Sequence, residues 1–287
     1  MPTVGAIEPL TQTFPLWLLG LLVIAVAVIA LEAGAWWGRR QLALSKEGVG
    51  AAPEKSDAQG HIIGSVFGLL AFLIGLTFSI ALDRYDSRRG WAAEEATAIS
   101  TAYLRAELFD EPHRSQLRST LHEYTRVRII PDNLTEDEAD PRYVQSEALR
   151  DRLWRETYHA VRPVRDTELA ANFVDSMNQA LDIGTRRALA GRSHIPAQIL
   201  DILLIYLIVS AAMLGFLMGR EQSARRFSSY TLVALFVLGI TLILDLDRPR
   251  SGSIKISQRG LEELLASMDA TARNEATVDP KIKAASP

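Results

Sequence analysis

One stretch without a charged side chain decides the fold: residues 62–82 read IIGSVFGLLAFLIGLTFSIAL. A helix needs about 20 mostly apolar residues to cross the hydrocarbon core of a bilayer, and this stretch is long enough. Backbone groups in lipid must satisfy their own hydrogen bonds, so an apolar run of this length is expected to be helical. The stretch therefore predicts a transmembrane helix.

Three further stretches of the 287-residue chain have the same character. Residues 15–37 and 195–219 each contain one acidic residue, and residues 227–246 contain one near their end. Buried helices of a large soluble protein are the alternative, but such helices rarely run this long with so few charges. We expect an all-α integral membrane protein with four transmembrane helices and a helical soluble insert between the second and third.

The charged residues gather between the apolar stretches and divide the chain into five segments. The predicted organisation is an N-terminal segment (1–14), a transmembrane hairpin (15–82, helices 15–37 and 62–82), a soluble helical domain (83–194), a second hairpin (195–246, helices 195–219 and 227–246) and a C-terminal tail (247–287). The tail ends in a polar stretch from Ala272 onward, about 15 residues, which is expected to be disordered.

Within the soluble domain the composition predicts helices throughout. No Gly or Pro interrupts residues 91–111, so the second transmembrane helix is expected to continue beyond the bilayer. Residues 131–141 read PDNLTEDEADP and predict a loop. Residues 142–161 and 167–187 are expected to be further helices, and the apolar stripe of the latter, which includes Phe173, is expected to be a packing surface.

The sequence offers no support for enzyme chemistry. The chain has no cysteine, its five histidines do not form metal-binding pairs at helical spacing, and G-x-S-x-G, P-loop and dinucleotide-binding motifs are absent. Glu94 and Glu95 are adjacent, so on a helix they point to different faces and cannot share one site. With a net charge of −3 and no basic run with interleaved aromatics, nucleic acid is not an expected partner. We expect no catalytic residue, no metal and no cofactor.

Two acidic residues lie within predicted transmembrane helices, Glu32 and Asp201. A charge inside a bilayer costs several kcal/mol, so such residues usually face a bundle interior, a water-filled cavity or a partner. Local pairing near the membrane interface is the alternative, and the sequence leaves both open. Asp245 and Asp247, at the end of the last transmembrane helix, are expected to pair with neighbouring arginines.

The second transmembrane helix carries a stripe that could line a pore. Small polar residues at both ends of this stripe enclose an apolar centre; its members are Ser65, Gly68, Leu69, Phe72, Leu76, Ser79 and Asp83. Channels use an apolar constriction as a gate that passes ions only when it is wetted. Gly64, Gly68 and Gly75 also leave room for another helix, and the spacing alone favours packing within the same subunit over a pore.

Three motifs carry a resemblance to a known family. Residues 78–89 match F-(T/S)-x-A-x-x-R-Y-D-x-R-R, residues 95–105 match E-A-x-A-I-x-T-A-Y-L-R, and residues 245–252 match D-x-D-R-P-R-x-G. In these the chain resembles a bacterial family of uncharacterised membrane proteins described as bestrophin-like. The likeness to bestrophins proper is distant and covers two segments, residues 84–91 and the stretch from Asp245 to Leu264. There the second Trp of the bestrophin pattern R-W-W is Asp86.

The resemblance implies an ion channel. Bestrophins are pentamers whose second transmembrane helices line a central pore, so it implies a homo-oligomer, a pentamer as best guess, that conducts an inorganic ion across the lipid bilayer. The narrow neck would fall on Gly68 or Leu69, Phe72 and Leu76, and Asp83 near the pore end would disfavour anions. The alternative is a non-conducting membrane scaffold or sensor whose helical domain binds a partner, and the oligomeric state would distinguish the two.

Two charged motifs are expected to meet where the helices leave the membrane. Both emerge at the same face and are dense in opposite charges, so we expect a structural network; its members are Arg84, Asp86, Arg88, Arg89, Trp91, Asp247, Arg248, Pro249 and Arg250. By the positive-inside rule the Lys and Arg counts are tied or lean toward a cytoplasmic insert, whereas the first helix alone, with Arg39 and Arg40 after it, favours the opposite orientation. By the resemblance, the protein lies in the bacterial inner membrane with the insert and both termini in the cytoplasm.

Overall fold

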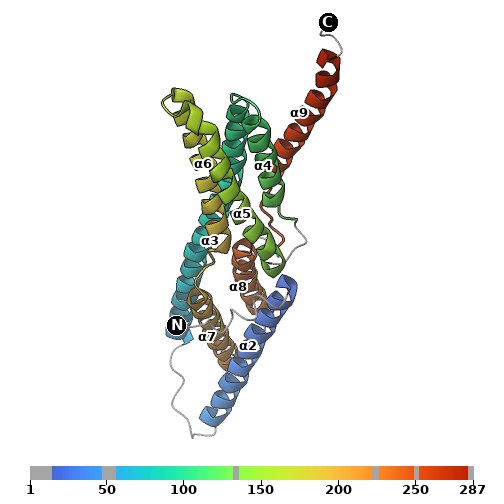
Figure 1. Ribbon diagram of the computed structural model, residues 1–287. Helices are drawn as coiled ribbons and strands as arrows, with labels where there is room; N and C mark the ends of the chain where they lie inside the picture. Colours follow the sequence, from blue (N-terminus) through green and yellow to red (C-terminus); the bar gives the residue numbers. More distant parts are fainter. Residues whose placement is uncertain (1–14, 47–55, 132–135, 222–225, 249–251, 284–287) are drawn as a thin grey trace. The chain divides into compact units, whose positions relative to one another are not determined.

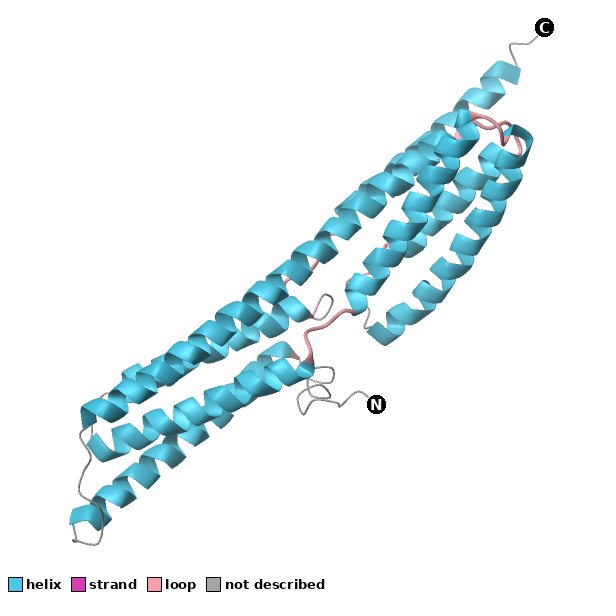
Figure 2. Ribbon diagram, turned by 90° about the vertical axis from the view of Figure 1, so that its left-hand side faces the viewer, coloured by secondary structure: helices cyan, strands magenta, loops and turns pink. Residues whose placement is uncertain are grey.

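The computed structural model describes residues 15–46, 56–131, 136–221, 226–248 and 252–283. Helices account for nearly all of this part, and no strand occurs within it (Figure 2). In chain order they are α2 (Leu16–Lys46), α3 (Ser56–Ala106), α4 (His113–Arg128), α5 (Glu136–Val161), the short 3-10 helix η1 (Arg162–Val164), α6 (Glu168–Arg192), α7 (Ala197–Glu221), α8 (Arg226–Asp247) and α9 (Arg259–Lys283), as Figure 1 labels them. The described part is all-α.

Four helices are long and apolar enough to cross a membrane. The candidate spans lie in Leu16–Leu44, Gln59–Ala106, Glu168–Arg220 and Arg226–Asp247. Each of the four predicted transmembrane stretches overlaps one of these spans. The predicted fold class, an all-α membrane protein, is confirmed.

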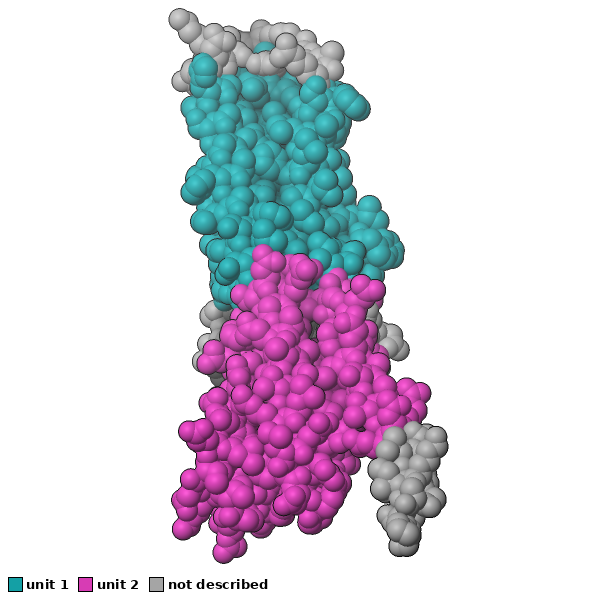
Figure 3. Space-filling view, turned by 90° about the horizontal axis from the view of Figure 1, so that it is seen from above, with its two compact units in different colours: residues 1–84, 194–254 teal, residues 85–193, 255–287 magenta. Residues whose placement is uncertain are grey.

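The chain divides into two compact units (Figure 3). The membrane unit comprises residues 1–84 and 194–254, and the insert unit comprises residues 85–193 and 255–287. Helix α3 is continuous over 51 residues, and no Gly or Pro follows Gly90 within it. Its first part belongs to the membrane unit and its second part to the insert unit. The continuation of this helix beyond its apolar stretch follows the sequence-based expectation.

The C-terminal helix differs from the expectation of a separate tail with a disordered end. Helix α9 belongs to the insert unit and continues to Lys283, while residues 284–287 lie outside the described part. An ion pair holds α9 against α4, because Glu275 Oε1 lies 2.6 Å from Arg118 Nη1. The expected loop over 131–141 is likewise shorter, because α5 begins at Glu136 and includes Pro141.

The insert unit has its own apolar core. Helices α3, α4, α5 and α6 contribute fully buried side chains to it, among them Ile99, Leu121, Leu153 and Phe173. The rings of Phe109 and Phe173 meet edge to face, with their centroids 4.7 Å apart. The face of α6 that was expected to be a packing surface is buried here, which gives the insert a rigid scaffold for its polar groups.

Glycines bring α2 and α7 into backbone contact in the membrane unit. A Cβ atom placed on Gly34 would lie 2.0 Å from the carbonyl oxygen of Ala212, and one on Gly215 would lie 1.9 Å from that of Leu31. Lipid tails are as apolar as the side chains, so helices in a bilayer associate through close packing, for which small residues are needed. The two helices approach so closely only because these positions have no side chain.

A single methyl group should therefore separate α2 from α7. We expect Gly215→Ala to lower the free energy of unfolding by about 1–3 kcal/mol, the usual cost of overpacking. Gly20→Ala in α2 is the matched control, because its Cβ would meet Thr241 at an ordinary contact distance of 3.4 Å. Thermal unfolding of the detergent-solubilised protein measures both, and equal unfolding midpoints for the two variants would contradict the close contact.

Candidate functional site: an exposed face of α3 and a buried charge cluster

The predicted stripe forms one exposed face of α3. Each residue turns a helix by about 100°, so the seven stripe residues from Ser65 to Asp83 lie within an arc of about 100°. All seven are exposed, and the apolar pair at the centre is prominently so: Phe72 is 65% and Leu76 is 51% exposed. The apolar centre and the polar ends thus share one surface of the membrane unit.

The opposite face of α3 attaches it to the rest of the membrane unit. Phe67, Leu70 and Ala81 are buried on this face, and the ring of Phe67 lies 5.4 Å from that of Phe236 in α8. From the sequence, packing within the subunit was the favoured role of the stripe. In the structure the stripe is exposed, and the buried residues of α3 lie about half a helical turn away from it.

Three glycines of α3 are not packed against another helix among the described residues. A Cβ atom on Gly64, Gly68 or Gly75 would have no atom within 4 Å. This contrasts with Gly34 and Gly215, where the missing side chain admits another helix of the same chain. The exposed face therefore has room for a further helix or for a solvent-filled space.

The polar atoms of this face include no metal site. Ser65 donates its hydroxyl hydrogen to the carbonyl oxygen of His61 one turn earlier, at 3.0 Å. Among the described residues no three His, Cys, Asp or Glu side chains come together to hold a metal ion. The face has the hydroxyl of Ser65 on one side of its apolar centre, and the hydroxyl of Ser79 and the carboxylate of Asp83 on the other.

The acidic residue Glu32 has local partners from two helices. The hydroxyl of Tyr230 in α8 donates to Glu32 Oε1, and Arg39 Nη2 lies 3.9 Å from Glu32 Oε2. Tyr230 belongs to another helix, whereas Arg39 lies on the same helix as Glu32, so both roles that the sequence left open remain predictions. Asp201, on α7, is half-buried.

The charged segment after the apolar part of α3 is anchored within the insert unit. Arg88 is buried; its Nε donates to the carbonyl oxygen of Ala190 at 3.0 Å, and its Nη2 donates to that of Ser193. The guanidinium of Arg186 lies over the ring of Trp91, 5.4 Å from its centroid. These contacts hold the start of the insert against the end of α6.

The motif at residues 245–252 accepts hydrogen bonds from backbone N–H groups. Asp247 Oδ1 accepts a hydrogen bond from the backbone N–H of Ile195 at 2.9 Å, and Asp245 Oδ1 accepts one from that of Ser253. A Cβ atom on Gly252 would lie 2.6 Å from Asp245 Oδ1, so the final Gly of the motif makes room for this turn. The hydrogen-bond donors are backbone groups, and the neighbouring Arg248 is attracted electrostatically to both carboxylates, as expected.

Two members of the expected charged network are not described by the structure. Pro249 and Arg250 are outside the described residues. Of the segment that starts at Arg84, Asp86 and Arg89 are exposed, whereas Arg88 is buried. A network that joins this segment to residues 247–250 remains a prediction.

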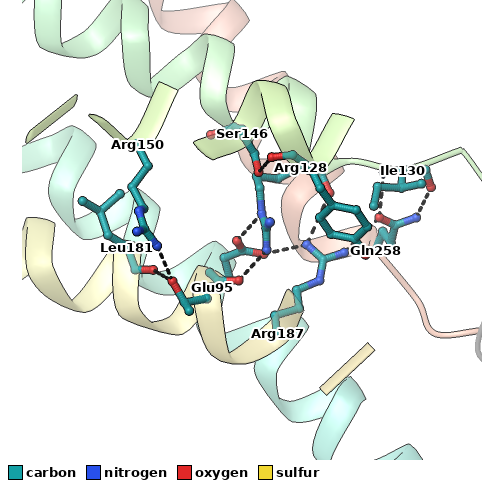
Figure 4. Close-up of polar contacts among 12 residues, drawn as sticks. Glu95, Arg128, Ile130, Ser146, Arg150, Leu181, Arg187 and Gln258 are labelled. Atoms are coloured by element: carbon teal, nitrogen blue, oxygen red, sulfur yellow. Dashed lines mark hydrogen bonds and ion pairs between the residues drawn. The ribbon is translucent and has the colours of Figure 1, made fainter. Parts of the chain in front are cut away.

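A buried carboxylate on α3 organises the polar interior of the insert unit. Glu95 is 0% exposed; its Oε1 lies 2.6 Å from Arg128 Nε in α4, and its Oε2 lies 2.6 Å from Arg187 Nη1 in α6 (Figure 4). Burial opposes the charge of Arg128, but the attraction of Glu95 outweighs it and raises the pKa of this guanidinium. One carboxylate thus joins three helices.

The same cluster holds the segment that leads into α9. Gln258 Oε1 accepts from Arg187 Nη2 and from the backbone N–H of Ile130, both at 3.0 Å, and its amide nitrogen donates to the Ile130 carbonyl oxygen (Figure 4). Arg128 Nη2 also donates to the carbonyl oxygen of Gly184 at 2.8 Å. The cluster therefore links the C-terminal segment to α3, α4 and α6.

Tyr124 and Gly184 complete the cluster. Burial raises the pKa of the Tyr124 phenol to about 12, so it stays neutral at physiological pH. A Cβ atom on Gly184 would lie 2.4 Å from Tyr124 Oη and 3.0 Å from Glu95 Oε1. Glycine is needed here because the phenol and the carboxylate occupy the space of a side chain.

Sequence reasoning missed Glu95, although a signal was present. Glu95 begins one of the family motifs, and it shares a helical face with Ala92, Ala96 and Ile99, which are buried. Glu94, its neighbour, is exposed. A carboxylate at the same spacing as buried apolar residues predicts a paired buried charge.

A second set of polar contacts joins α4 to α9. Arg118 donates to Tyr103 Oη at 2.8 Å and pairs with Glu275 at 2.6 Å. Burial lowers the pKa of Arg118, but the hydrogen bonds to Glu275 and Tyr103 outweigh this and raise it overall. His122 Nε2 lies 2.7 Å from Asp269 Oδ1, and Asp269 precedes Glu275 by less than two turns of α9.

Comparison with known proteins identifies the class. The bestrophin-like domain matches residues 26–261, which is most of the chain. A crystal structure of a point variant of a bacterial bestrophin homolog from Klebsiella pneumoniae has a TM-score of 0.62 and 14% identity, and the match covers 88% of this chain and 98% of that chain. A structure described as a membrane protein has a TM-score of 0.62 and 13% identity, with 87% and 96% covered. Proteins of curated function give no significant match.

The fold and the matched domain define an all-α membrane protein of the bestrophin fold. The chain belongs to the bestrophin-like family.

Removing the charge of Glu95 should destabilise the insert unit. Glu95→Gln leaves the buried Arg128 and the half-buried Arg187 without their carboxylate, and breaking a buried ion pair on one side costs about 3–5 kcal/mol. Glu94→Gln is the matched control, because it makes the same change at the adjacent, exposed position. We expect thermal unfolding to show a clear loss for Glu95→Gln and little change for Glu94→Gln; similar midpoints would contradict a structural role of the pair.

Proposed function

We propose that the protein is a homo-oligomeric ion channel whose pore is lined by the exposed face of α3. The observation that carries this proposal is that a face with polar ends and an apolar centre points away from the chain's own bundle. Membership of the bestrophin-like family supports it. A pentamer, as in bestrophins, is the assembly that we propose.

Lipid alone is a poor partner for this face. Ser65, Ser79 and the glycines gain little from contact with acyl chains, and an exposed carboxylate such as Asp83 is costly anywhere near hydrocarbon. Open glycines favour close approach of helices instead. Copies of α3 arranged around an axis would exchange these lipid contacts for helix contacts and a hydrated path.

Phe72 and Leu76 form the gate in this proposal. Apolar side chains at a constriction a few ångströms wide exclude water, because a water column there loses hydrogen bonds that the wall cannot replace. Ser65 and Ser79 hydrate the two ends, and Gly68 with Leu69 extends the narrow neck. Asp83, at the end of the neck, attracts cations and disfavours anions.

Shortening the gate side chains should increase conduction. We expect Phe72→Ala and Leu76→Ala to raise conductance or to leak constitutively in reconstituted bilayers, because a wider ring is more easily wetted. Leu238→Ala is the matched control, because Leu238 lies on α8 and is similarly exposed at 64%. Asp83→Asn should change ion selectivity without changing assembly.

Two outcomes would contradict the channel. Silence of the wild type and of both alanine variants, with the oligomer intact, would favour the non-conducting scaffold. A monomer or a two-fold dimer in a detergent mass measurement would also favour it. Gly68→Leu should weaken the oligomer or block conduction, and an unchanged particle with unchanged current would show that Gly68 faces lipid.

The proposed location is the inner membrane with a cytoplasmic insert. Four spans place the insert and both termini on one side of the membrane. Reporters fused at Asn133 and at the C-terminus should therefore report the same compartment, the cytoplasm. Agreement on the periplasm would reverse the orientation, and disagreement between the two fusions would exclude four spans.

A further inference from the structure

Exposed tryptophans flank the apolar part of α2. Trp17 is 66% and Trp36 is 52% exposed, and Trp37 is exposed as well. At 1.5 Å per residue, Trp17 and Trp36 are about 28 Å apart along the helix, close to the thickness of the hydrocarbon core. Tryptophan is enriched at membrane–water interfaces, so Trp36 and Trp37 place the headgroup layer just beyond them.

Arginines follow these tryptophans. Arg39 and Arg40 follow after Gly38 and are exposed, and the guanidinium of Arg40 lies over the Trp36 ring, 5.3 Å from its centroid. One helical turn beyond Trp36 corresponds to about 5 Å, which puts these charges at the depth of lipid phosphates. An aromatic anchor and a cation thus stand side by side at the interface.

Two other helices bring arginines to the same end. The backbone N of Arg220 in α7 lies 3.2 Å from where a Gly38 Cβ would be, so Gly38 admits Arg220 beside Arg39. Arg226 opens α8 one turn before Tyr230, whose hydroxyl donates to Glu32 in α2. The guanidinium groups therefore come from three helices that contact one another within the membrane unit.

The sequence around these arginines is net positive. Residues 32–60 and 216–231 contain seven Lys or Arg and five Asp or Glu. Arg220 is held in place by a 3.4 Å hydrogen bond to Gln59 Oε1 and by the Phe216 ring at 5.8 Å. Guanidinium groups bind phosphate through paired hydrogen bonds, and positioned ones lose less freedom when they bind.

We propose that this end of the membrane unit is a binding site for an anionic phospholipid headgroup. Arg39, Arg40, Arg220 and Arg226 bind its phosphate and its additional negative charge, while Trp36 and Trp37 pack against the glycerol region. A bilayer presents phospholipid headgroups at the depth of these arginines, whereas a free phosphate would have to compete from solution. The site does not depend on the proposed channel.

Lipid selectivity tests this site without any measurement of conduction. The detergent-solubilised protein is titrated with phosphatidylglycerol, phosphatidylcholine or inorganic phosphate, and the retained lipid and the thermal midpoint are measured. The wild type should retain phosphatidylglycerol preferentially and be stabilised by it. Arg40→Gln combined with Arg226→Gln should reduce this preference about tenfold, since each cation adds severalfold to attraction by an anionic surface.

Two control variants distinguish loss of charge at this site from a general effect of the substitutions on the protein. Arg40→Lys combined with Arg226→Lys keeps both charges and should retain most of the preference. Arg126→Gln combined with Arg155→Gln removes two exposed charges from the insert unit and should leave the preference unchanged.

Three results would overturn the proposal. Equal retention of the two lipids by the wild type would exclude a headgroup site. An unchanged preference in the Arg40 and Arg226 glutamine variant would exclude these arginines. Equal stabilisation by inorganic phosphate at the same concentration would assign the site to a soluble anion instead.

Discussion

The hydrocarbon core offers no hydrogen-bond partners, and most features of this protein follow from that constraint. It forces the spanning segments to be helices, and it removes the hydrophobic drive that would hold them together. Close backbone contact must replace that drive, which is why Gly34 meets the carbonyl of Ala212 and Gly215 meets that of Leu31. The same reasoning applies to Gly64, Gly68 and Gly75 of α3, which have no such backbone contact among the described residues.

Helix α3 buries different kinds of side chain in its two parts. In its apolar part it exposes a face and buries the other against α8, as the contact of Phe67 with Phe236 shows. In the insert unit it buries a full charge, Glu95, which two arginines compensate. A buried ion cluster adds little net stability compared with apolar packing, but it tolerates few alternative arrangements. The insert is therefore specified by polar contacts as well as by its core.

The sequence predicted the spans well because long stretches without charge have few alternatives in a folded chain. It also predicted which residues share a face of α3, since helical spacing determines this. Gly34 and Gly38 in α2 are four residues apart, and so are Gly215 and Gly219 in α7. This spacing indicates a site of close helix packing, but it does not reveal which helix is the partner. The spacing of Glu95 with Ala92 and Ile99 indicates that it is the buried one of the two adjacent glutamates, but the sequence does not show that Arg128 in α4 and Arg187 in α6 are its partners. The extent of α9 was missed because its order depends on contacts with α4, such as that of Arg118 with Glu275.

The side chain of Gln258 behaves as a short piece of backbone. Its carbonyl and amide groups pair with the N–H and carbonyl of Ile130, as one residue of a β-ladder would. A chain that ended before this residue would leave the Ile130 N–H and one nitrogen of Arg187 without their protein partner. The folded insert therefore includes residue 258 and extends into α9, because Leu261 and Met268 of that helix are buried in the same core.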